Sequence, residues 1–362
     1  MINLIPKIFF YNLFYYFGWP KIGPFNITLG LTYNCNSRCQ TCNIWRKTPV
    51  RELNLDEHKK IFKSIGRFPY EIILTGGEPF LKKEIVSICG LIDKYLKPKA
   101  IIIPTNGLLS EIIPKRVEEI LKSLPKTDIV VNLSLDGFGP LHDKIRGIPG
   151  NFDKALKTYN ALRSLKAGNK NLDFKIHTVI SKFNVKEIPQ IYRYIRDELG
   201  SPPFITEIAE ERVELNTLGS MISPLTADYI RVVDFLISEI KKEKFSGLDR
   251  VIQAFRIEYY NLVKKILLNK KRALPCFAAI TSVQITPDGY VWACCIKGES
   301  MGDLRRANYD FNKIWQSQRA KSIRKAIKER KCFCPLANAS YTNMLCHLPT
   351  LLKVGLRLLT NL

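Results

Sequence analysis

Short runs of β-branched and aliphatic residues alternate with amphipathic segments along most of the chain. Each run has the length of a strand, and each intervening segment carries apolar residues at helical spacing. The predicted strands cover residues 25–32, 71–75, 100–104, 128–135, 173–180 and 204–209. The predicted helices cover residues 56–66, 82–95, 111–123, 151–166 and 186–198. Apolar strands that alternate with helices indicate a parallel sheet covered by helices, so these units predict an α/β fold, a partial (β/α)6 TIM-like barrel.

The pattern changes after the sixth predicted strand. Residues 224–243 and 248–270 are predicted to form two further helices. From Cys276 onward the alternation stops and cysteines return. We therefore expect a barrel over residues 25–272, followed by a small cysteine-rich α+β extension over residues 273–348.

Both ends of the chain are apolar. The N-terminal segment, residues 1–24, contains IFFYNLFYYFGW (8–19), which is shorter than the roughly 20 residues of a membrane-spanning helix. The amphipathic tail over residues 349–362 carries leucines on one helical face and cations on another, namely Leu352, Leu356, Leu359, Lys353 and Arg357. Two interpretations are open: the two segments lie in a bilayer interface, or they pack on the protein's own core.

The chain is strongly basic, with 56 Lys and Arg against 33 Asp and Glu, a formal net charge of +23. Charge of this sign favours an anionic partner, whether a membrane face, an acidic substrate or nucleic acid, although a merely basic surface is also compatible with it. Cationic stretches at 264–272 and 319–331 suit anionic headgroups. No known RNA-binding module is recognisable, so a nucleic-acid partner is not expected.

The chain contains ten cysteines but no recognisable secretory signal. Clustered cysteines in a chain of this kind more often ligate metal than form disulfides, so we expect a reducing, cytoplasmic location. The apolar ends extend this expectation to peripheral contact with the inner face of the cell membrane. Cys89 lies within a periodic predicted helix, which indicates a core residue.

Three cysteines crowd into one loop after the first predicted strand, in TYNCNSRCQTCNIW (32–45). They are Cys35, Cys39 and Cys42, with the spacing C-x3-C-x2-C. In a parallel barrel, loops at the carboxyl ends of the strands carry the active site. Thiolates at this spacing suit zinc or an iron–sulfur cluster, but structural zinc requires a fourth ligand nearby. A [4Fe–4S] cluster held by three cysteines leaves one iron open to bind a ligand, which explains the missing fourth residue.

With this loop the sequence resembles the radical S-adenosylmethionine (SAM) superfamily, and the resemblance spans residues 25–210. Motifs similar to those of the family follow at the next three strand ends: GGEP (76–79), TNG (105–107) and SLDG (134–137). HDKIRG (142–147) resembles a further segment of the family that contains an arginine. The resemblance implies a [4Fe–4S] cluster on the three-cysteine loop with SAM beside it. The residues that it assigns to SAM are Gly76, Gly77, Glu78, Pro79, Asn106, Ser134, Asp136 and Arg146.

The chemistry of these residues suits the parts of SAM. Glu78 offers a carboxylate to the methionine ammonium, and Arg146 offers a bidentate guanidinium to the methionine carboxylate. Ser134 and Asp136 can bond hydroxyl groups. The glycines at 76–77 are expected to remove side chains where the ligand meets the backbone.

One position departs from the family pattern. Thr41 stands where an aromatic residue often packs on the adenine ring. Ile44 or Trp45 is therefore expected to make this contact.

Three polar residues follow or lie within the last predicted strands of the barrel. His177 alternates on its strand with Lys175 and Val179, so it is a candidate to face the barrel interior, although a satisfied core histidine is the simpler interpretation. Glu207 and Glu210, at the end of the sixth strand, are candidates for contact with a substrate, although a structural role is the simpler interpretation.

A second group of cysteines lies in the C-terminal extension, at Cys276, Cys294, Cys295, Cys332, Cys334 and Cys346. A cysteine, then G-x4-C, then a later cysteine cluster resembles the SPASM and twitch extensions of radical SAM enzymes, which bind auxiliary [4Fe–4S] clusters. A full SPASM extension has seven cysteines and two clusters, whereas this region has six cysteines. We therefore expect one auxiliary cluster with Cys276, Cys294, Cys332 and Cys334 as ligands and Cys346 as a substitute. Cys295 is interpreted as a buried neighbour, with a ligand role as the alternative, and zinc is the alternative metal.

The resemblance implies a radical SAM oxidoreductase or modifying enzyme. An electron from an external donor of the ferredoxin or flavodoxin type would cleave SAM reductively to a 5′-deoxyadenosyl radical, which abstracts hydrogen from an unactivated carbon. The apolar ends and the positive charge favour a lipid or other membrane-proximal small-molecule substrate. The alternatives are maturation of a ribosomally made peptide and, in a different class, a non-catalytic iron–sulfur carrier. The sequence assigns no catalytic residue.

Overall fold

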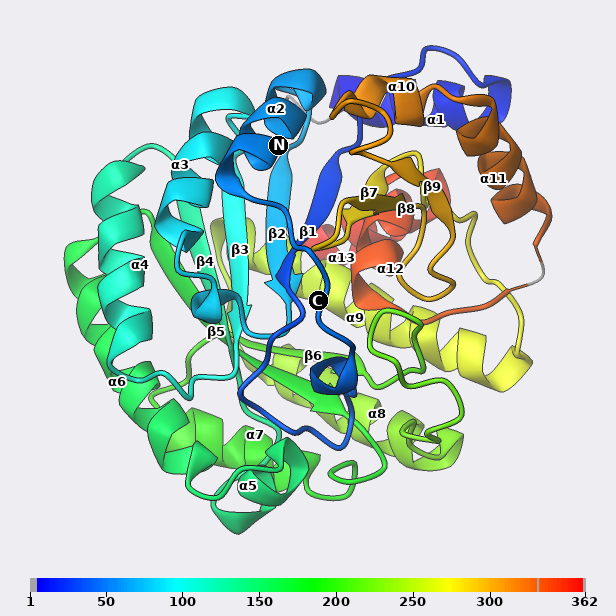
Figure 1. Cartoon of the computed structure of the whole chain (residues 1–362). Helices are drawn as coiled ribbons and strands as arrows, with labels where there is room; N and C mark the ends of the chain where they lie inside the picture. The colour runs from blue at the N-terminus through cyan, green and yellow to red at the C-terminus, as the bar shows by residue number, and fades with distance from the viewer. Residues whose placement is uncertain (1–4, 331, 361–362) are drawn as a thin grey trace.

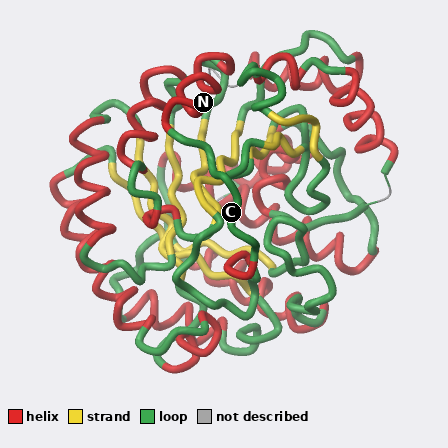
Figure 2. Tube along the Cα trace, in the orientation of Figure 1, coloured by secondary structure: helices red, strands yellow, loops and turns green. Residues whose placement is uncertain are grey.

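A nine-stranded sheet runs through the computed structural model, which describes residues 5–330 and 332–360. The strand order is β6-β5-β4-β3-β2-β1-β7-β8-β9. The strands are β1 (Asn26–Thr32), β2 (Glu71–Gly76), β3 (Ala100–Thr105), β4 (Asp128–Ser134), β5 (Leu172–Ile180), β6 (Phe204–Ile208), β7 (Ser282–Ile285), β8 (Tyr290–Trp292) and β9 (Ser300–Asp303). Neighbouring strands from β6 to β7 in this order are parallel, whereas β8 and β9 pair antiparallel. Figure 2 shows the strands in yellow, enclosed by the helices.

Helices cover the outer face of the parallel strands and form the rest of the extension (Figure 1). The barrel helices are α2 (Leu55–Ile65), α3 (Ile85–Tyr95), α4 (Ile112–Ser123), α5 (Pro140–Arg146), α6 (Asn151–Gly168), α7 (Ile188–Asp197), α8 (Thr226–Lys242) and α9 (Gly247–Asn269). The remaining α-helices are α1 (Ile5–Phe17), α10 (Phe311–Trp315), α11 (Gln318–Glu329), α12 (Ala337–Leu345) and α13 (Leu348–Leu359). Two short 3-10 helices, η2 (Ile44–Arg46) and η3 (Pro79–Leu81), follow β1 and β2.

The predicted fold class is confirmed. Strands β1 to β6 each begin and end within one residue of the predicted ranges, because their apolar runs are nearly continuous. Helix α5, which covers seven residues of the HDKIRG motif and its flank, was not predicted. Nor were strands predicted in the extension, where β7 to β9 are only three or four residues long.

The C-terminal extension continues the sheet of the barrel. Strand β7 pairs parallel with β1, from Asn26 opposite Ser282 to Leu29 opposite Ile285. The proposed boundary at residue 272 falls between the end of α9 and this strand. Backbone hydrogen bonds therefore fix the extension against the first strand of the barrel, immediately beside the loop that carries the three cysteines.

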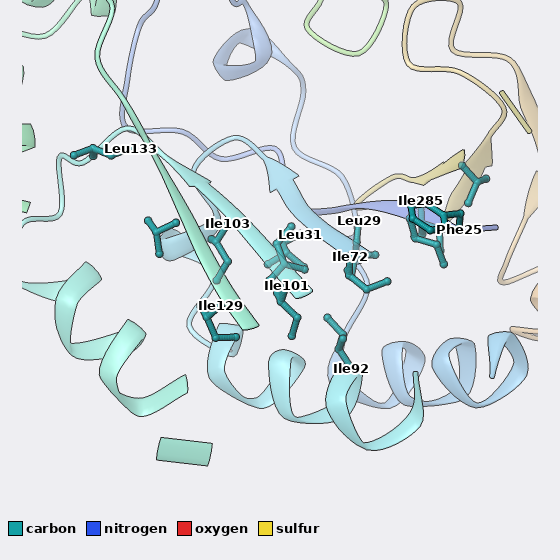
Figure 3. Close-up of a cluster of buried hydrophobic side chains, with 14 of the residues drawn as sticks. Phe25, Leu29, Leu31, Ile72, Ile92, Ile101, Ile103, Ile129, Leu133 and Ile285 are labelled. Atoms are coloured by element: carbon teal, nitrogen blue, oxygen red, sulfur yellow. The ribbon is translucent and has the colours of Figure 1, made fainter. Parts of the chain in front are cut away.

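Aliphatic side chains of neighbouring strands form the core between the sheet and its covering helices (Figure 3). Leu29, Ile72, Ile101 and Ile129 are buried on β1 to β4, and Ile92 of α3 is buried in the same cluster. Complete burial of one such side chain stabilises the fold by about 1.5–3 kcal/mol. This rigid layer holds the strand ends, and hence the loops that follow them, in fixed positions.

Each apolar end of the chain packs one face on the protein and leaves the other exposed. In α1, Tyr11 and Phe14 are buried, whereas Phe17 is 79% exposed. In α13, Val354 is buried and Leu359 is 81% exposed. The predicted terminal segments also include residues 1–4 and 361–362, which lie outside the described residues. Within the described chain, no helix combines the length and the apolar character that crossing a membrane requires.

Candidate functional site

A cavity of about 180 Å³ lies at the carboxyl ends of the parallel strands. The thiol-bearing residues Cys35, Cys39 and Cys42 line it. Six residues that we predicted to bind SAM line it as well: Gly76, Gly77, Glu78, Asn106, Ser134 and Arg146. The other two, Pro79 and Asp136, are buried outside this lining. The fold therefore gathers residues from four strand ends and from α5 around one space.

The end of β2 holds one side of the three-cysteine loop. The backbone N–H of Gly77 donates to the carbonyl of Thr32 at 2.7 Å, and that of Glu78 donates to the carbonyl of Asn34 at 2.9 Å. A Cβ on Gly76 would lie 2.1 Å from the Thr32 oxygen, and one on Gly77 would lie 2.0 Å from the Asn34 oxygen. We expected these glycines to make room for a ligand. Both line the cavity, but it is the backbone of the cysteine loop that excludes their side chains.

The end of α5 holds the other side of the loop. The backbone N–H of Arg38 donates to the carbonyl of Arg146 at 2.9 Å, and that of Gln40 donates to the carbonyl of Ile145 at 2.8 Å. Gly147 has a φ of +69°, and a Cβ there would lie 2.3 Å from the Arg38 oxygen. The HDKIRG motif therefore positions the cysteine loop through its backbone as well as through the Arg146 side chain.

Glu78 is buried, and its carboxylate is held in one orientation. It accepts hydrogen bonds from the Thr105 hydroxyl at 2.9 Å and from the backbone N–H groups of Asn106 at 2.8 Å and Phe80 at 3.2 Å. Burial raises the pKa of Glu78 to about 7, against the opposing effect of these hydrogen bonds. The hydrogen bonds alone do not fully compensate the buried charge of the Glu78 carboxylate. An ammonium group of a ligand would supply the remaining compensation.

Asp136 and Arg146 form a buried ion pair, with Arg146 Nη2 at 2.8 Å from Asp136 Oδ2. Asp136 also accepts a hydrogen bond from the backbone N–H of Val179 at 2.9 Å. On its other side, Arg146 Nη1 lies 3.7 Å from Cys39 Sγ. Our interpretation of Asp136 as a hydroxyl-binding residue does not fit this placement, because its carboxylate anchors Arg146 and does not line the cavity.

The residues around the third cysteine separate into two environments. Thr41 and Ile44 line the cavity. Trp45 lies between two guanidinium groups, those of Arg38 at 4.8 Å and Arg46 at 4.6 Å from its ring centroid, and does not line the cavity. Of the two residues expected to meet an adenine ring, Ile44 is thus the one in position.

The thiols of the loop fit a cluster better than a single ion. Burial raises the pKa of Cys35 to about 11 and that of Cys42 to about 12, so these thiols need a bound cation in order to ionise. Among the residues that the structure describes, no three His, Cys, Asp or Glu side chains converge closely enough to hold one metal ion. An iron–sulfur cluster spreads its thiolate ligands over several iron atoms, which this wider arrangement accommodates.

Four cysteines of the extension are near enough for their charges to influence one another, although among the described residues no three of them converge on one metal ion. Burial raises the pKa of Cys276, and the charge of nearby Cys332 adds to this. Burial likewise raises the pKa of Cys334, with contributions from Cys276 and Cys294. Arg272 Nη2 donates to Cys332 Sγ at 3.0 Å and thus provides a positive charge at the edge of the group. All ten cysteines of the chain are free thiols.

The remaining cysteines lie elsewhere. Cys346 is buried beside Tyr11 of α1 in a small apolar pocket, where burial alone raises its pKa to about 12. Its place as a substitute ligand therefore does not fit the structure. The backbone carbonyl of Cys295 accepts a hydrogen bond from the backbone N–H of Glu214 at 3.2 Å. This contact is compatible with our interpretation of Cys295 as a buried neighbour of Cys294. Cys89 is completely buried in the core of the barrel.

A charged cluster at the end of β6, formed by Glu207, Glu210 and Arg212, lines the same cavity together with His177 of the neighbouring strand β5. We interpreted His177 as a core residue, but it borders the cavity, with Nε2 at 3.8 Å from Glu207 Oε1. The sequence analysis missed Arg212, which follows the strand in an irregular loop. The available signal was the charged run EERVE (210–214) after an apolar strand.

The segment that follows this cluster connects the two cysteine sites. The carbonyl of Leu215 accepts a hydrogen bond at 2.9 Å from the backbone N–H of Asn43, next to Cys42. The backbone N–H of Glu214 donates at 3.2 Å to the carbonyl of Cys295, next to Cys294. Residues 213–216 therefore link the three-cysteine loop to the cysteines of the extension.

Two family models match the regions that carry these sites. The Radical SAM superfamily matches residues 29–195, and the SPASM iron–sulfur cluster-binding domain matches residues 276–335. The first contains the three-cysteine loop and the predicted SAM residues. The second contains Cys276, Cys294, Cys332 and Cys334, and excludes Cys346.

Individual relatives agree with these matches. The chain is 26% identical over 329 residues to the antilisterial bacteriocin subtilosin biosynthesis protein AlbA of Bacillus subtilis, covering 87% of this chain and 66% of that protein. It is 29% identical over 180 residues to the Fe-coproporphyrin III synthase of Methanosarcina barkeri, covering 48% of this chain and 41% of that protein. The chain thus spans less than two thirds of the length of these two curated relatives.

A solved structure shows the same fold. The chain aligns to anSMEcpe, solved with bound AdoMet and the Cp18Cys peptide, with a TM-score of 0.59 and 16% identity over 83% of both chains. A radical SAM domain binds a [4Fe–4S] cluster and SAM, and a SPASM domain indicates auxiliary iron–sulfur clusters. The cysteine spacing, the fold and the two matches together show that the chain carries a radical SAM domain and a SPASM iron–sulfur domain.

Proposed function

We propose that this protein is a radical SAM enzyme that modifies a ribosomally made peptide. The observation that carries the chemistry is the single cavity on which the three cysteines and six predicted SAM residues converge. The choice of substrate is supported by the relative AlbA, whose alignment covers 87% of this chain and which is named for the biosynthesis of a bacteriocin. The lipid substrate that the apolar ends favoured stays a prediction.

In this proposal Cys35, Cys39 and Cys42 hold the [4Fe–4S] cluster. The bound cluster and SAM together supply one-electron chemistry that removes a hydrogen atom from an unactivated carbon. The chain's own residues would bind and orient SAM: Glu78 would accept hydrogen bonds from the methionine ammonium, and Arg146, fixed by its ion pair, would donate to the methionine carboxylate. The loop is clamped on both sides by backbone hydrogen bonds, so the cofactor and the thiols keep one mutual arrangement.

The extension would hold one auxiliary cluster on Cys276, Cys294, Cys332 and Cys334. Arg272 donates to the Cys332 sulfur, and a hydrogen bond to a ligating sulfur stabilises its negative charge. An external donor of the ferredoxin or flavodoxin type would reduce the protein in the cytoplasm. A non-catalytic carrier is the competing hypothesis, but it would have no use for the buried Glu78 and Arg146 beside the cysteine loop.

The test is release of 5′-deoxyadenosine by the anaerobically reconstituted protein with a strong reductant. Small peptides extracted from the host are expected to stimulate release, and digestion of the extract with a protease is expected to abolish the stimulation. Stimulation by a lipid extract instead would restore the lipid substrate. No release with both sites loaded with iron would support the carrier.

Exposed apolar residues on the terminal helices support a second proposal, peripheral binding to an anionic membrane. On α1 these are Phe9, Phe10, Tyr16 and Phe17, and on α13 they are Leu348, Leu352, Leu356 and Leu359. Membrane binding would place a substrate made or exported at the membrane near the enzyme. Flotation with phosphatidylglycerol vesicles tests this: Leu352→Ser with Leu356→Ser should reduce binding, and equal flotation of the parent and the double variant would exclude α13 as the contact.

A further inference from the structure

The charged cluster at the end of β6 holds more carboxyl groups than cationic groups. Arg212 Nη2 lies 3.5 Å from Glu207 Oε1 and 3.7 Å from Glu210 Oε1. Both distances exceed those of a good hydrogen bond, so the guanidinium satisfies neither carboxylate fully. Glu214 acts on Arg212 as a third nearby carboxylate. One guanidinium thus faces three carboxyl groups, so a further cation bound at the cluster would be stabilised.

Glu210 is the least compensated member of the cluster. The residue is only 9% exposed, and its Oε1 has no hydrogen-bond partner in the described chain. Burial raises its pKa to about 8, with Glu207 adding to the effect and Arg212 opposing it. Burial also lowers the pKa of His177, so this neighbour does not supply the missing charge near neutral pH. A buried carboxylate in this condition is costly unless a ligand provides a cation or a donor.

The position of the cluster separates it from the SAM residues. Those residues come from the ends of β2, β3 and β4 and from α5, whereas the cluster lies at the end of β6. Glu210 is also close enough to Cys294 and Cys334 of the extension to raise the pKa of both thiols. The cluster thus borders the cavity and is also the part of its lining that lies near the second cysteine group.

We propose that Glu207 and Glu210 bind a primary ammonium group of the substrate. This inference rests on the proposed function, because a peptide carries such a group on a lysine side chain or at its amino terminus. A compact ammonium offers three donors and one positive charge, which match two carboxylates that share a single guanidinium. An anionic substrate group is disfavoured here, since Arg212 already faces two carboxylates and Arg146, paired with Asp136, is assigned to SAM.

The test is isothermal titration calorimetry on the anaerobically reconstituted protein with SAM present. The ligands are Nα-acetyl-lysine methylamide, its norleucine analogue, which has a methyl group in place of the ammonium, and alanine methylamide, which has only an α-amine. We expect at least one of the two amines to bind, and we expect the norleucine compound not to bind. Glu207→Gln and Glu210→Gln should each weaken amine binding by about tenfold or more. Glu198→Gln removes an exposed carboxylate at the end of α7 and should leave binding unchanged.

Binding of the lysine compound would assign the site to a side chain, and binding of the alanine compound would assign it to an amino terminus. Equal affinity for the norleucine compound, absence of amine binding, or unchanged binding by both Gln variants would overturn the proposal. Iron content and melting temperature verify that each variant is folded, and Glu210→Asp should restore part of the affinity. Peptide-stimulated SAM cleavage without amine binding would refute this site alone, whereas amine binding without that stimulation would refute the peptide substrate alone.

Discussion

Removing the charge of Asp136 should destabilise the protein strongly. Its carboxylate is 1% exposed and pairs at 2.8 Å with Arg146, whose side chain is 11% exposed. Two unit charges at this distance attract by about 6 kcal/mol at an effective dielectric constant of about 20. Asp136→Asn keeps an oxygen for the backbone N–H of Val179 but leaves the guanidinium buried without a counter-charge. We expect a loss of about 3–5 kcal/mol in the free energy of unfolding, the usual result when one partner of a buried pair is removed.

Urea unfolding of the iron-free protein measures this loss without interference from cluster decay. The matched control is Asp128→Asn, because Asp128 pairs with Lys99 at the same distance of 2.8 Å while the two side chains are 44% and 56% exposed. Solvent screening reduces such a pair to about 0–1 kcal/mol. If Asp136→Asn lowers the free energy of unfolding no more than Asp128→Asn does, the ion pair does not hold Arg146 in place. The proposed role of Asp136 in fixing the end of α5 would then be wrong. If Asp136→Asn costs the expected amount, iron uptake by the three-cysteine loop should fall with it, because Arg146 also accepts a backbone hydrogen bond from that loop.

Three further predictions test the loop, the extension and the acid response. Gly77→Ala should abolish iron binding at the three-cysteine loop, because its Cβ would lie 2.0 Å from a loop carbonyl oxygen. Gly90→Ala in α3, where a Cβ meets no atom within 4 Å, should leave the iron content unchanged, and equal iron in both variants would contradict the clash. Cys334→Ala should remove the auxiliary iron, whereas Cys346→Ala should not. Both are measured in a protein that lacks the three cysteines of the loop after β1. The reverse result would return Cys346 to the ligand set. His58 is buried and its pKa is lowered from 6.5 to about 4, so the unfolded chain binds a proton below pH 6.5 that the folded one refuses. The free energy of unfolding should therefore fall by about 3 kcal/mol between pH 6.5 and 4, and His58→Leu should flatten this slope in urea titrations at several pH values.

The barrel could be predicted because its signal is local. Each strand from β1 to β6 is a continuous apolar run, and each helix between them shows its own amphipathic period. The strands of the extension could not be predicted in this way, because three or four residues give no period. Their pairing depends on the edge that β1 offers to β7, a contact between segments more than two hundred residues apart.

The site shows the same division between local and distant information. Motif spacing identified the three cysteines and most of the cavity lining, because each motif lies at the end of one strand. It did not reveal that Asp136 turns away to hold Arg146, or that Cys346 packs against Tyr11, since both depend on where another segment lies. The role of Gly77 was misjudged for the same reason: the oxygen that excludes its side chain belongs to a loop more than forty residues earlier.

The separation of the two cysteine sites follows from backbone contacts that do not depend on bound iron. Strand β7 attaches the extension to β1, and residues 213–216 bond to both the three-cysteine loop and the segment after Cys294. Arg305 of the extension adds a third connection through its Nε, which donates to Glu57 of α2 at 2.7 Å. With three independent connections the extension cannot rotate as a unit without breaking sheet hydrogen bonds, each of which would leave buried polar groups unpaired. The extension therefore keeps a fixed position beside the barrel, and a substrate group held by the β6 cluster would meet the same surroundings in every turnover.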